Sequence, residues 1–209
     1  MTTTPEPPRD WNQRYRAGET PWDSGKPSKE LARLLAEFEI APCRTLEIGC
    51  GTGTNAIFLT QQGFEVTAVD IAPLAIEQAR SKAAAAGVVI DFAVADLVSP
   101  PQSLIEAGPF ELVFDRGVYH AVRRTDLAGF LRTLEQVTAA GSLYLVLAGN
   151  ANDPCVEEEG PPRVSAEELC RELGELFALV QLREFHFDEV VIEGQPRDFL
   201  GWSAVWRRR

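Results

Sequence analysis

The stretch LEIGCGTGTN, residues 46–55, decides the fold of this 209-residue chain. A short apolar run comes directly before Gly49, Gly51 and Gly53, and a helical pattern follows them. Glycines in a turn between a strand and a helix adopt backbone angles closed to other residues, and they let a ligand approach the main chain. The stretch therefore predicts a ligand-binding turn at the carboxyl end of a first strand.

The spacing of the glycines narrows the class of ligand. Thr54 stands where the dinucleotide fingerprint requires another glycine, so the turn departs from the one that holds the diphosphate of NAD. Glu47, just before the turn, would repel a diphosphate and suits the ammonium of an amino acid. An NAD-dependent oxidoreductase is accordingly the least favoured interpretation.

Apolar runs and helical patterns alternate along the chain on both sides of this turn. Such alternation predicts a mostly parallel sheet with helices on both faces. The carboxyl ends of its strands share one edge, where α/β folds bind ligands. Ser28 and Ser165 are expected helix N-caps, and Pro73 and Gly87 are expected to delimit a helix. The expected strands are residues 44–48, 64–69, 88–94, 110–114 and 142–147, with a closing hairpin at 180–187 and 199–206; the expected helices are 31–38, 55–62, 73–86, 127–139 and 166–177.

Acidic residues close the next three strands. Asp70 follows the second strand, roughly twenty residues beyond the turn, where a carboxylate can bind both ribose hydroxyls. Asp96 closes the third strand, where it could accept a hydrogen bond from an adenine amino group, and Asp115 closes the fourth. Each acid alone is equally compatible with a helix N-cap. Together with the glycine turn they indicate a nucleoside site.

Composition excludes several classes of partner. The formal net charge is −11, from 20 basic and 31 acidic residues, so nucleic acid and anionic membranes are disfavoured. No apolar stretch is long enough to span a bilayer, and the first eight residues lack an apolar signal core, which predicts a cytoplasmic protein. Cys43, Cys50, Cys155 and Cys170 lack the close spacing of a zinc site, so we expect free thiols and no metal.

The residues above resemble the motif set of class I S-adenosylmethionine-dependent methyltransferases, over about residues 46–147. The resemblance implies an α/β, Rossmann-like fold: a seven-stranded, mostly parallel sheet of order 3-2-1-4-5-7-6, with helices on both faces and the last-numbered strand antiparallel. It also implies S-adenosylmethionine as the cofactor. The expected cofactor-binding residues are Trp11, Tyr15, Trp22, Glu47, Gly49, Gly51, Gly53, Asn55, Asp70, Ile71, Asp96, Leu97 and Asp115.

The N-terminal segment narrows the family. Trp11, Tyr15 and Trp22 form a Trp-x3-aromatic-x6-Trp pattern similar to the N-terminal lid of thiol, halide and thiopurine methyltransferases. Their rings would face a cationic sulfonium, although for any one ring a hydrophobic patch that closes the open edge of the sheet is the better explanation. We expect residues 1–10 to be disordered, and residues 11–209 to form one domain whose lid spans 11–40.

Two later segments are expected on the acceptor side. GPPRVS, residues 160–165, resembles the acceptor-side loop of the same family, and FDRGVYH, residues 114–120, follows the fourth strand. Arg116 would favour an anionic acceptor, and Tyr119 or His120 would orient it or take its proton, whereas a lone histidine is as often structural. The expected catalytic residues are Asp115, Arg116, Tyr119 and His120.

The function predicted from these motifs is methyl transfer to a small molecule by in-line displacement. A thiol or another soft nucleophile is the favoured acceptor, because a thiol with a pKa near 8.5 ionises with little help. Small-molecule O- or N-methylation with His120 as base is the alternative within enzymes. A non-catalytic cofactor-binding regulator is the alternative of another class. The sequence leaves open whether the protein is a monomer or a homodimer.

Overall fold

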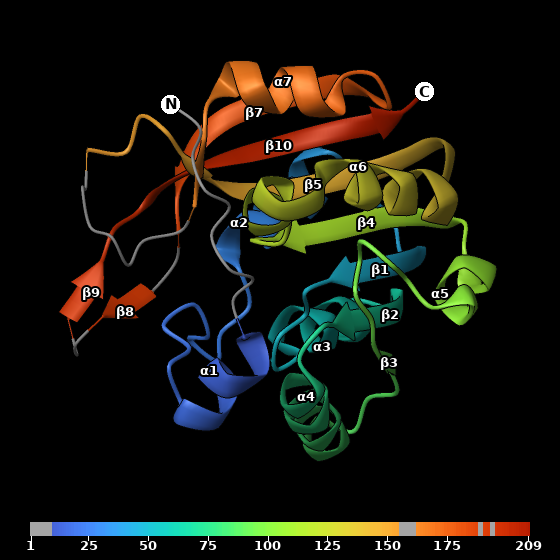
Figure 1. Cartoon of the computed structure of the whole chain (residues 1–209). Coiled ribbons are helices and arrows are strands. Elements are labelled where there is room, and N and C mark those ends of the chain that lie inside the picture. Colours follow the sequence, from blue (N-terminus) through green and yellow to red (C-terminus); the bar gives the residue numbers. More distant parts are fainter. Residues whose placement is uncertain (1–9, 155–161, 188–189, 193–194) are drawn as a thin grey trace.

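The described strands, apart from one separate two-stranded hairpin, form one mixed sheet in the order that the resemblance implies (Figure 1). The structure, a computed structural model, describes residues 10–154, 162–187, 190–192 and 195–209. Neighbours are parallel from β3 to β5, and β10 runs antiparallel to both of its neighbours. The order is β3 (Asp91–Val94), β2 (Glu65–Asp70), β1 (Arg44–Ile48), β4 (Phe110–Arg116), β5 (Thr138–Asn150), β10 (Leu200–Arg208) and β7 (Phe177–His186), with β6 (Arg163–Val164) paired to the end of β5.

Helices cover both faces of the sheet, as predicted. Successive side chains of each central strand enter opposite cores. On β4, Leu112 packs with one set of helices and Val113 with the other. One core lies under α5 (Gln102–Ala107), α6 (Tyr119–Val137) and α7 (Ala166–Leu173), and the other under α2 (Lys29–Glu37), α3 (Thr54–Gln61) and α4 (Pro73–Ala86). The short helix α1 (Trp11–Ala17) packs against α4.

Local signals fix the helix ends that the sequence predicts. The Ser28 side chain accepts a hydrogen bond from the Leu31 N–H, and Ser165 forms a reciprocal capping box with Glu168. Helix α4 spans its predicted residues, with Pro73 in the first turn and Gly87 in a left-handed conformation just after the end.

Elsewhere the elements differ from the prediction. Helix α6 begins at Tyr119, eight residues before the expected start, and it kinks at Asp126, whose carboxylate accepts from the Gly129 N–H and starts the second half. Gly141, two residues beyond the expected helix 127–139, lies inside the long strand β5. Helix α5, strand β6 and the hairpin of β8 (Val190–Ile192) and β9 (Gln195–Arg197) were not predicted.

The remaining expectations concern the ends and the cysteines. Asp10 is the N-cap of α1, and residues 1–9 of the expected disordered segment lie outside the described residues. Within the part of the chain that the structure describes, no helix has the length and apolarity needed to cross a bilayer, and no cluster of metal-ligand side chains occurs. Cys43, Cys50 and Cys170 are free, and Cys155 is not described.

Candidate active site

The glycine turn joins β1 to α3 with its glycines in left-handed backbone conformations. Gly49, Gly51 and Gly53 have φ values of +62°, +54° and +80°. A Cβ on Gly49 would lie only 2.1 Å from the Val118 side chain, and one on Gly53 would lie 2.9 Å from the Ala79 Cβ. The turn therefore requires glycine at these two positions for conformation and for space. It lies directly against the segment that follows β4.

The acid at the end of β2 is built into this turn. The Asp70 carboxylate accepts hydrogen bonds from the Gly51 N–H at 2.9 Å and the Ala72 N–H at 2.8 Å, one on each oxygen. Burial raises the pKa of Asp70. Each oxygen still has a lone pair for a further donor. The next residue, Ile71, exposes 48% of its surface and so places an apolar side chain in solvent beside this acid.

The acid that follows the third strand, Asp96, is held by a local hydrogen bond. The Asp96 carboxylate accepts from the Val98 N–H at 3.0 Å, which is the bond of a local turn. Asp96 is half-buried, so part of its carboxylate faces solvent. Leu97 is buried in the core beneath α5 and α6, and its main chain alone can line the edge of the sheet.

Glu47 is the most unusual charge in the site. Its side chain is buried, and its Oε2 atom has no hydrogen-bond partner among the described residues. Burial raises the pKa of Glu47 to about 8, although the Asn55 side chain and the Ala56 N–H hydrogen-bond it. The Asn55 side-chain oxygen also accepts from the Ser28 N–H at 2.8 Å, and this bond orients the amide that hydrogen-bonds Glu47. A cationic ligand would complete this carboxyl group.

The aromatic residues of the lid gather over the glycine turn. The Trp22 ring makes edge-to-face contacts with Trp11 and Tyr15, at centroid distances of 5.5 and 6.2 Å. The Trp22 indole N–H donates to the Tyr15 hydroxyl at 3.3 Å. A Cβ on Gly51 would lie 2.9 Å from that hydroxyl. The structure thus brings these three aromatic residues, expected from the sequence, to the predicted turn.

Polar contacts fasten the lid to three parts of the site, and no sequence pattern marks the residues that make them. Asp23 accepts from the Thr52 hydroxyl at 2.6 Å, in the glycine turn, and its carboxylate lies 3.6 Å from the ammonium of Lys82 on α4. The Asn12 side chain accepts from the Leu74 N–H at 3.0 Å. At the end of β4, Arg116 donates to the Trp22 carbonyl at 3.0 Å. Residues far apart in the sequence therefore define the closed lid.

Asp115, at the end of β4, caps the helix that follows it. Its carboxylate is fully buried and accepts from the Val118 N–H at 2.7 Å, the Tyr119 N–H at 2.9 Å and the Tyr144 hydroxyl at 2.8 Å. Burial raises the pKa of Asp115 to about 6 despite these bonds. These contacts are those of a cap that holds the first turn of α6, and the catalytic and cofactor-binding role expected of Asp115 stays a prediction.

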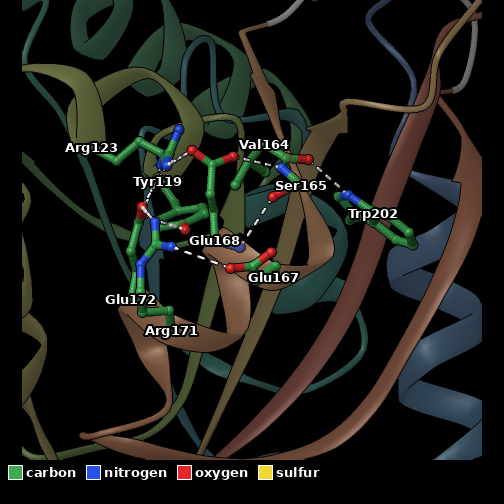
Figure 2. Close-up of polar contacts among 9 residues, drawn as sticks. All are labelled: Tyr119, Arg123, Val164, Ser165, Glu167, Glu168, Arg171, Glu172 and Trp202. Carbon is green, nitrogen blue, oxygen red and sulfur yellow. Dashed lines mark hydrogen bonds and ion pairs between the residues drawn. The ribbon is translucent and has the colours of Figure 1, made fainter.

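Tyr119 directs its hydroxyl group towards α7 (Figure 2). The fully buried phenol donates to Glu172 at 2.8 Å, and Arg123 donates to the same carboxylate and, at 2.9 Å, to Glu168. Burial raises the pKa of Tyr119 above its ordinary value. This network, which the sequence did not reveal, ties the first turn of α6 to α7.

The same network reaches the segment expected to line the acceptor side. Glu168 bonds both Arg123 and the Ser165 N–H, and the Trp202 indole N–H donates to the Val164 carbonyl at 2.9 Å (Figure 2). Gly160 and Pro161 lie outside the described residues. The structure therefore fixes Val164 and Ser165, the last two residues of that segment.

Arg116 and His120 remain as side chains of the acceptor side. The Arg116 guanidinium lies 5.5 Å from the centre of the Phe187 ring, a residue that the sequence did not single out. The buried His120 ring accepts from the Gly149 N–H at 2.8 Å through Nδ1. Its opposite edge lies against Gly117, where a Cβ would be 3.3 Å from Nε2. The ring thus bridges the carboxyl ends of β4 and β5.

Comparison with known sequences gives a family and several relatives. The family described as Thiopurine S-methyltransferase matches residues 7–197. A 2-heptyl-1-hydroxyquinolin-4(1H)-one methyltransferase of Mycobacteroides abscessus is 28% identical over 154 residues, which cover 73% of this chain and 66% of the relative. A probable thiol methyltransferase 2 of Arabidopsis thaliana is 35% identical over 72 residues, or 34% of this chain and 32% of the relative. The chain thus spans less than two thirds of the length of these relatives.

Solved structures share the fold. One, from work on "Conversion of a Disulfide Bond into a Thioacetal Group during Echinomycin Biosynthesis", has a TM-score of 0.78 at 25% identity and covers 93% of this chain and 90% of its own. Magnesium protoporphyrin IX methyltransferase from Synechocystis PCC 6803, with bound S-adenosylmethionine, has a TM-score of 0.60 at 16% identity and covers 97% of this chain and 86% of its own. The second likeness shows the fold alone.

Proposed function

Because the chain belongs to the thiopurine S-methyltransferase family, we propose that it transfers a methyl group from S-adenosylmethionine to a small thiol or a comparable soft nucleophile. The observation that carries this proposal is the extent of the family match. It covers the lid, the glycine turn and the end of β4, so both the cofactor side and the acceptor side belong to one family pattern.

The residues of the site fit the proposed cofactor. The unpaired oxygen of buried Glu47 suits the ammonium of the methionine part, and Asp70 retains lone pairs for ribose hydroxyls. The exposed Ile71 offers an apolar face to adenine, and Asp96 offers an acceptor to its amino group. The Arg14 guanidinium lies 4.6 Å from the centre of the Trp22 ring and takes one face of it, so Tyr15 and the other face of Trp22 are the ring surfaces that could attract a cation. When bound, S-adenosylmethionine supplies an electrophilic methyl group on a sulfonium.

The protein contributes chiefly by positioning. Holding an acceptor in line with a methyl group can remove about 7–11 kcal/mol of barrier when the geometry is ideal. The lid, fastened through Asp23 and Arg116 beside the glycine turn, would keep water from a cofactor bound there. Asp115 and Tyr119 support this geometry as positioning residues, because they hold the first turn of α6.

A second candidate is O-methylation of an acidic hydroxyl on a flat heteroaromatic ring. The M. abscessus relative is named for a hydroxyquinolone, and it matches 73% of this chain. Phe187, with the Arg116 guanidinium beside its ring, would suit a flat anionic acceptor. The two candidates share their cofactor and differ only in the atom that receives the methyl group.

A panel of acceptors with methyl-labelled S-adenosylmethionine tests both candidates. The panel contains aryl and alkyl thiols, a 1-hydroxyquinolone, phenols, amines and iodide. We expect the label on thiols first and on the hydroxyquinolone second. Binding of S-adenosylhomocysteine with no transfer to any acceptor would instead favour a regulatory cofactor-binding protein. Asp70→Asn serves as the control that should lose cofactor binding, and with it any genuine transfer.

A further inference from the structure

We propose that Lys82, Thr52 and Asp23 form a latch that holds the lid on the glycine turn and sets the rate at which S-adenosyl ligands enter and leave. Asp23 belongs to the lid, Thr52 to the glycine turn and Lys82 to α4. None of the three is an expected ligand of the cofactor, so each is a positioning residue that acts through the lid. The latch acts on the cofactor of the proposed function, on which this role rests, and is independent of the acceptor.

The Thr52 hydroxyl is the centre of the latch. It donates to the Asp23 carboxylate at 2.6 Å and accepts from the Lys82 ammonium. A hydroxyl group has one hydrogen to donate and lone pairs that accept, so it can bond both charged groups at once. The Lys82 ammonium also lies 3.6 Å from the Asp23 oxygen that Thr52 contacts. The Asp23 side chain is 17% exposed and that of Lys82 43%, so water screens this pair only in part.

The lid presents Asp23 in a fixed orientation. The second oxygen of its carboxylate accepts from the Gly25 N–H at 3.1 Å. Its own N–H donates to the Thr20 carbonyl at 2.9 Å, which closes a turn in the main chain. The carboxylate is therefore tied to the main chain on both sides of Asp23. Moving it away from Thr52 would move this whole loop of the lid.

The loop lies over the place where the cofactor is expected. The Tyr15 hydroxyl is directly above Gly51, where a Cβ would be 2.9 Å from it. The Gly51 N–H donates to Asp70, the acid proposed to bind the ribose. The Trp22 indole N–H donates to the same Tyr15 hydroxyl, and Trp22 directly precedes Asp23. A nucleoside at Asp70 would thus lie beside these rings, and movement of the loop would open the way to it.

The other end of the lid is anchored to the helix that carries Lys82. Helix α1 packs against α4 (Figure 1), and the Asn12 side chain accepts from the Leu74 N–H in the first turn of α4. Helix α4 therefore holds the lid at two points, near its start and in its second half. The second point depends on side chains alone, so a substitution can release the loop while α1 stays on α4.

Every partner in the latch belongs to the protein itself, so the latch needs no ligand in order to form. A contact that the free and the liganded protein share keeps the lid in place in both. It slows the entry and the exit of the ligand by the same factor, and it leaves the affinity unchanged. Loss of a residue that binds the cofactor would instead mainly speed exit and weaken affinity. Kinetics can therefore separate the two roles.

Stopped-flow binding of S-adenosylhomocysteine to the full chain tests the latch, with tryptophan fluorescence, to which Trp11 and Trp22 contribute, as the signal. Thr52→Val keeps the shape of the side chain and removes the hydroxyl. We expect it to raise both the association and the dissociation rate constants about 10-fold, near the lower end for lost hydrogen bonds to charged groups. Lys82→Met should raise both about 2- to 5-fold, because a half-exposed ion pair contributes less. The dissociation constant in calorimetry should stay within about two-fold of the wild type.

Salt and two further variants complete the test. Raising the ionic strength from about 0.05 to 0.5 M should speed both steps about two-fold in the wild type and hardly at all in Lys82→Met, since the ligand carries no net charge at neutral pH. Lys82→Arg keeps the charge and should restore most of the wild-type rates. Arg132→Gln removes an exposed charge from α6, which covers the other face of the sheet. It is the matched control and should bind as the wild type does.

Three results would count against the latch. Wild-type rates in both Thr52→Val and Lys82→Met would overturn it, because other contacts would then hold the lid. Faster exit without faster entry would also overturn it, and would place these residues in the cofactor site itself. Absence of any binding of S-adenosylhomocysteine to the wild type would contradict the cofactor, and the latch with it, so that the two failures are told apart.

Discussion

Binding of the cofactor is expected to release a proton from Glu47. Burial raises the pKa of this carboxyl to about 8, so at pH 7 it is protonated in about nine of ten free molecules. An ammonium beside it favours the ionised form. The α-amine of S-adenosylhomocysteine, like that of other free amino acids, is already protonated at pH 7 and takes up almost no proton. The net release is therefore about 0.9 proton.

Titration calorimetry with S-adenosylhomocysteine measures this release directly. Phosphate and Tris differ in their heats of ionisation, so the difference between the observed heats at pH 7 gives the number of protons exchanged. The dissociation constant should also fall about eight-fold from pH 6.5 to 7.5, because about 0.9 proton is released on binding. Glu47→Gln should bind more weakly and exchange almost no proton.

Glu65→Gln is the matched control, since this exposed glutamate is the first residue of β2 and lies at the amino ends of the parallel strands, away from the cofactor site. It should release as many protons as the wild type. Equal heats in the two buffers for the wild type would refute the reasoning, as would an undiminished release in Glu47→Gln. Either result would mean that no cation ionises Glu47.

Three further predictions follow from single contacts. Gly49→Ala should weaken cofactor binding at least ten-fold in calorimetry, because its φ of +62° disfavours a side chain and the new Cβ would lie 2.1 Å from the Val118 side chain. Gly141→Ala is the control: its φ is +92° but the space around it is open, so it should lose only about 1–2 kcal/mol of stability and no affinity. Arg123→Met should cost about 3 kcal/mol in denaturant unfolding, because the Glu172 carboxylate loses its paired guanidinium and keeps the Tyr119 hydroxyl and the more distant Arg171, and Glu172→Gln in the same background should recover part of the loss. The protonated Glu47 carboxyl, with a pKa near 4.5 in the unfolded chain and about 8 in the fold, contributes stability that is fully present below pH 4.5 and is lost as pH rises through about 8. The Tm of Glu47→Gln minus that of the wild type should therefore increase from pH 5 to pH 9; a constant difference would contradict this.

The sequence predicts the first half of the fold well, because its signals there are local. Strand β1 and helix α4 have their predicted bounds. An apolar run followed by a glycine defines β1, and a proline at the start and a glycine just after the end define α4. Helix α6 was predicted to begin too late. Its first turn carries buried polar residues such as His120, and these break the apolar period from which a helix is recognised.

The cofactor side of the site was accessible to the sequence for a simple reason. Strand ends lie at one edge of a parallel sheet, so the glycine turn and Asp70 had to be neighbours. The contacts of the lid join Asp23 to Thr52 and Lys82, and no local pattern marks pairs so far apart.

The acceptor side shows a different limit. Tyr119 and His120 were both expected at the reacting atoms, although successive helix residues point about 100° apart. The structure resolves the conflict: the Tyr119 hydroxyl bonds Glu172 on α7, and the His120 ring bonds Gly149 on β5.

The position of a bound nucleoside tests the central claim most directly. In a crystal structure with S-adenosylhomocysteine, we expect the ribose hydroxyls within hydrogen-bond distance of Asp70 and the amino group on Glu47. A ligand bound elsewhere, with the buried Glu47 oxygen still lacking a partner, would contradict the account.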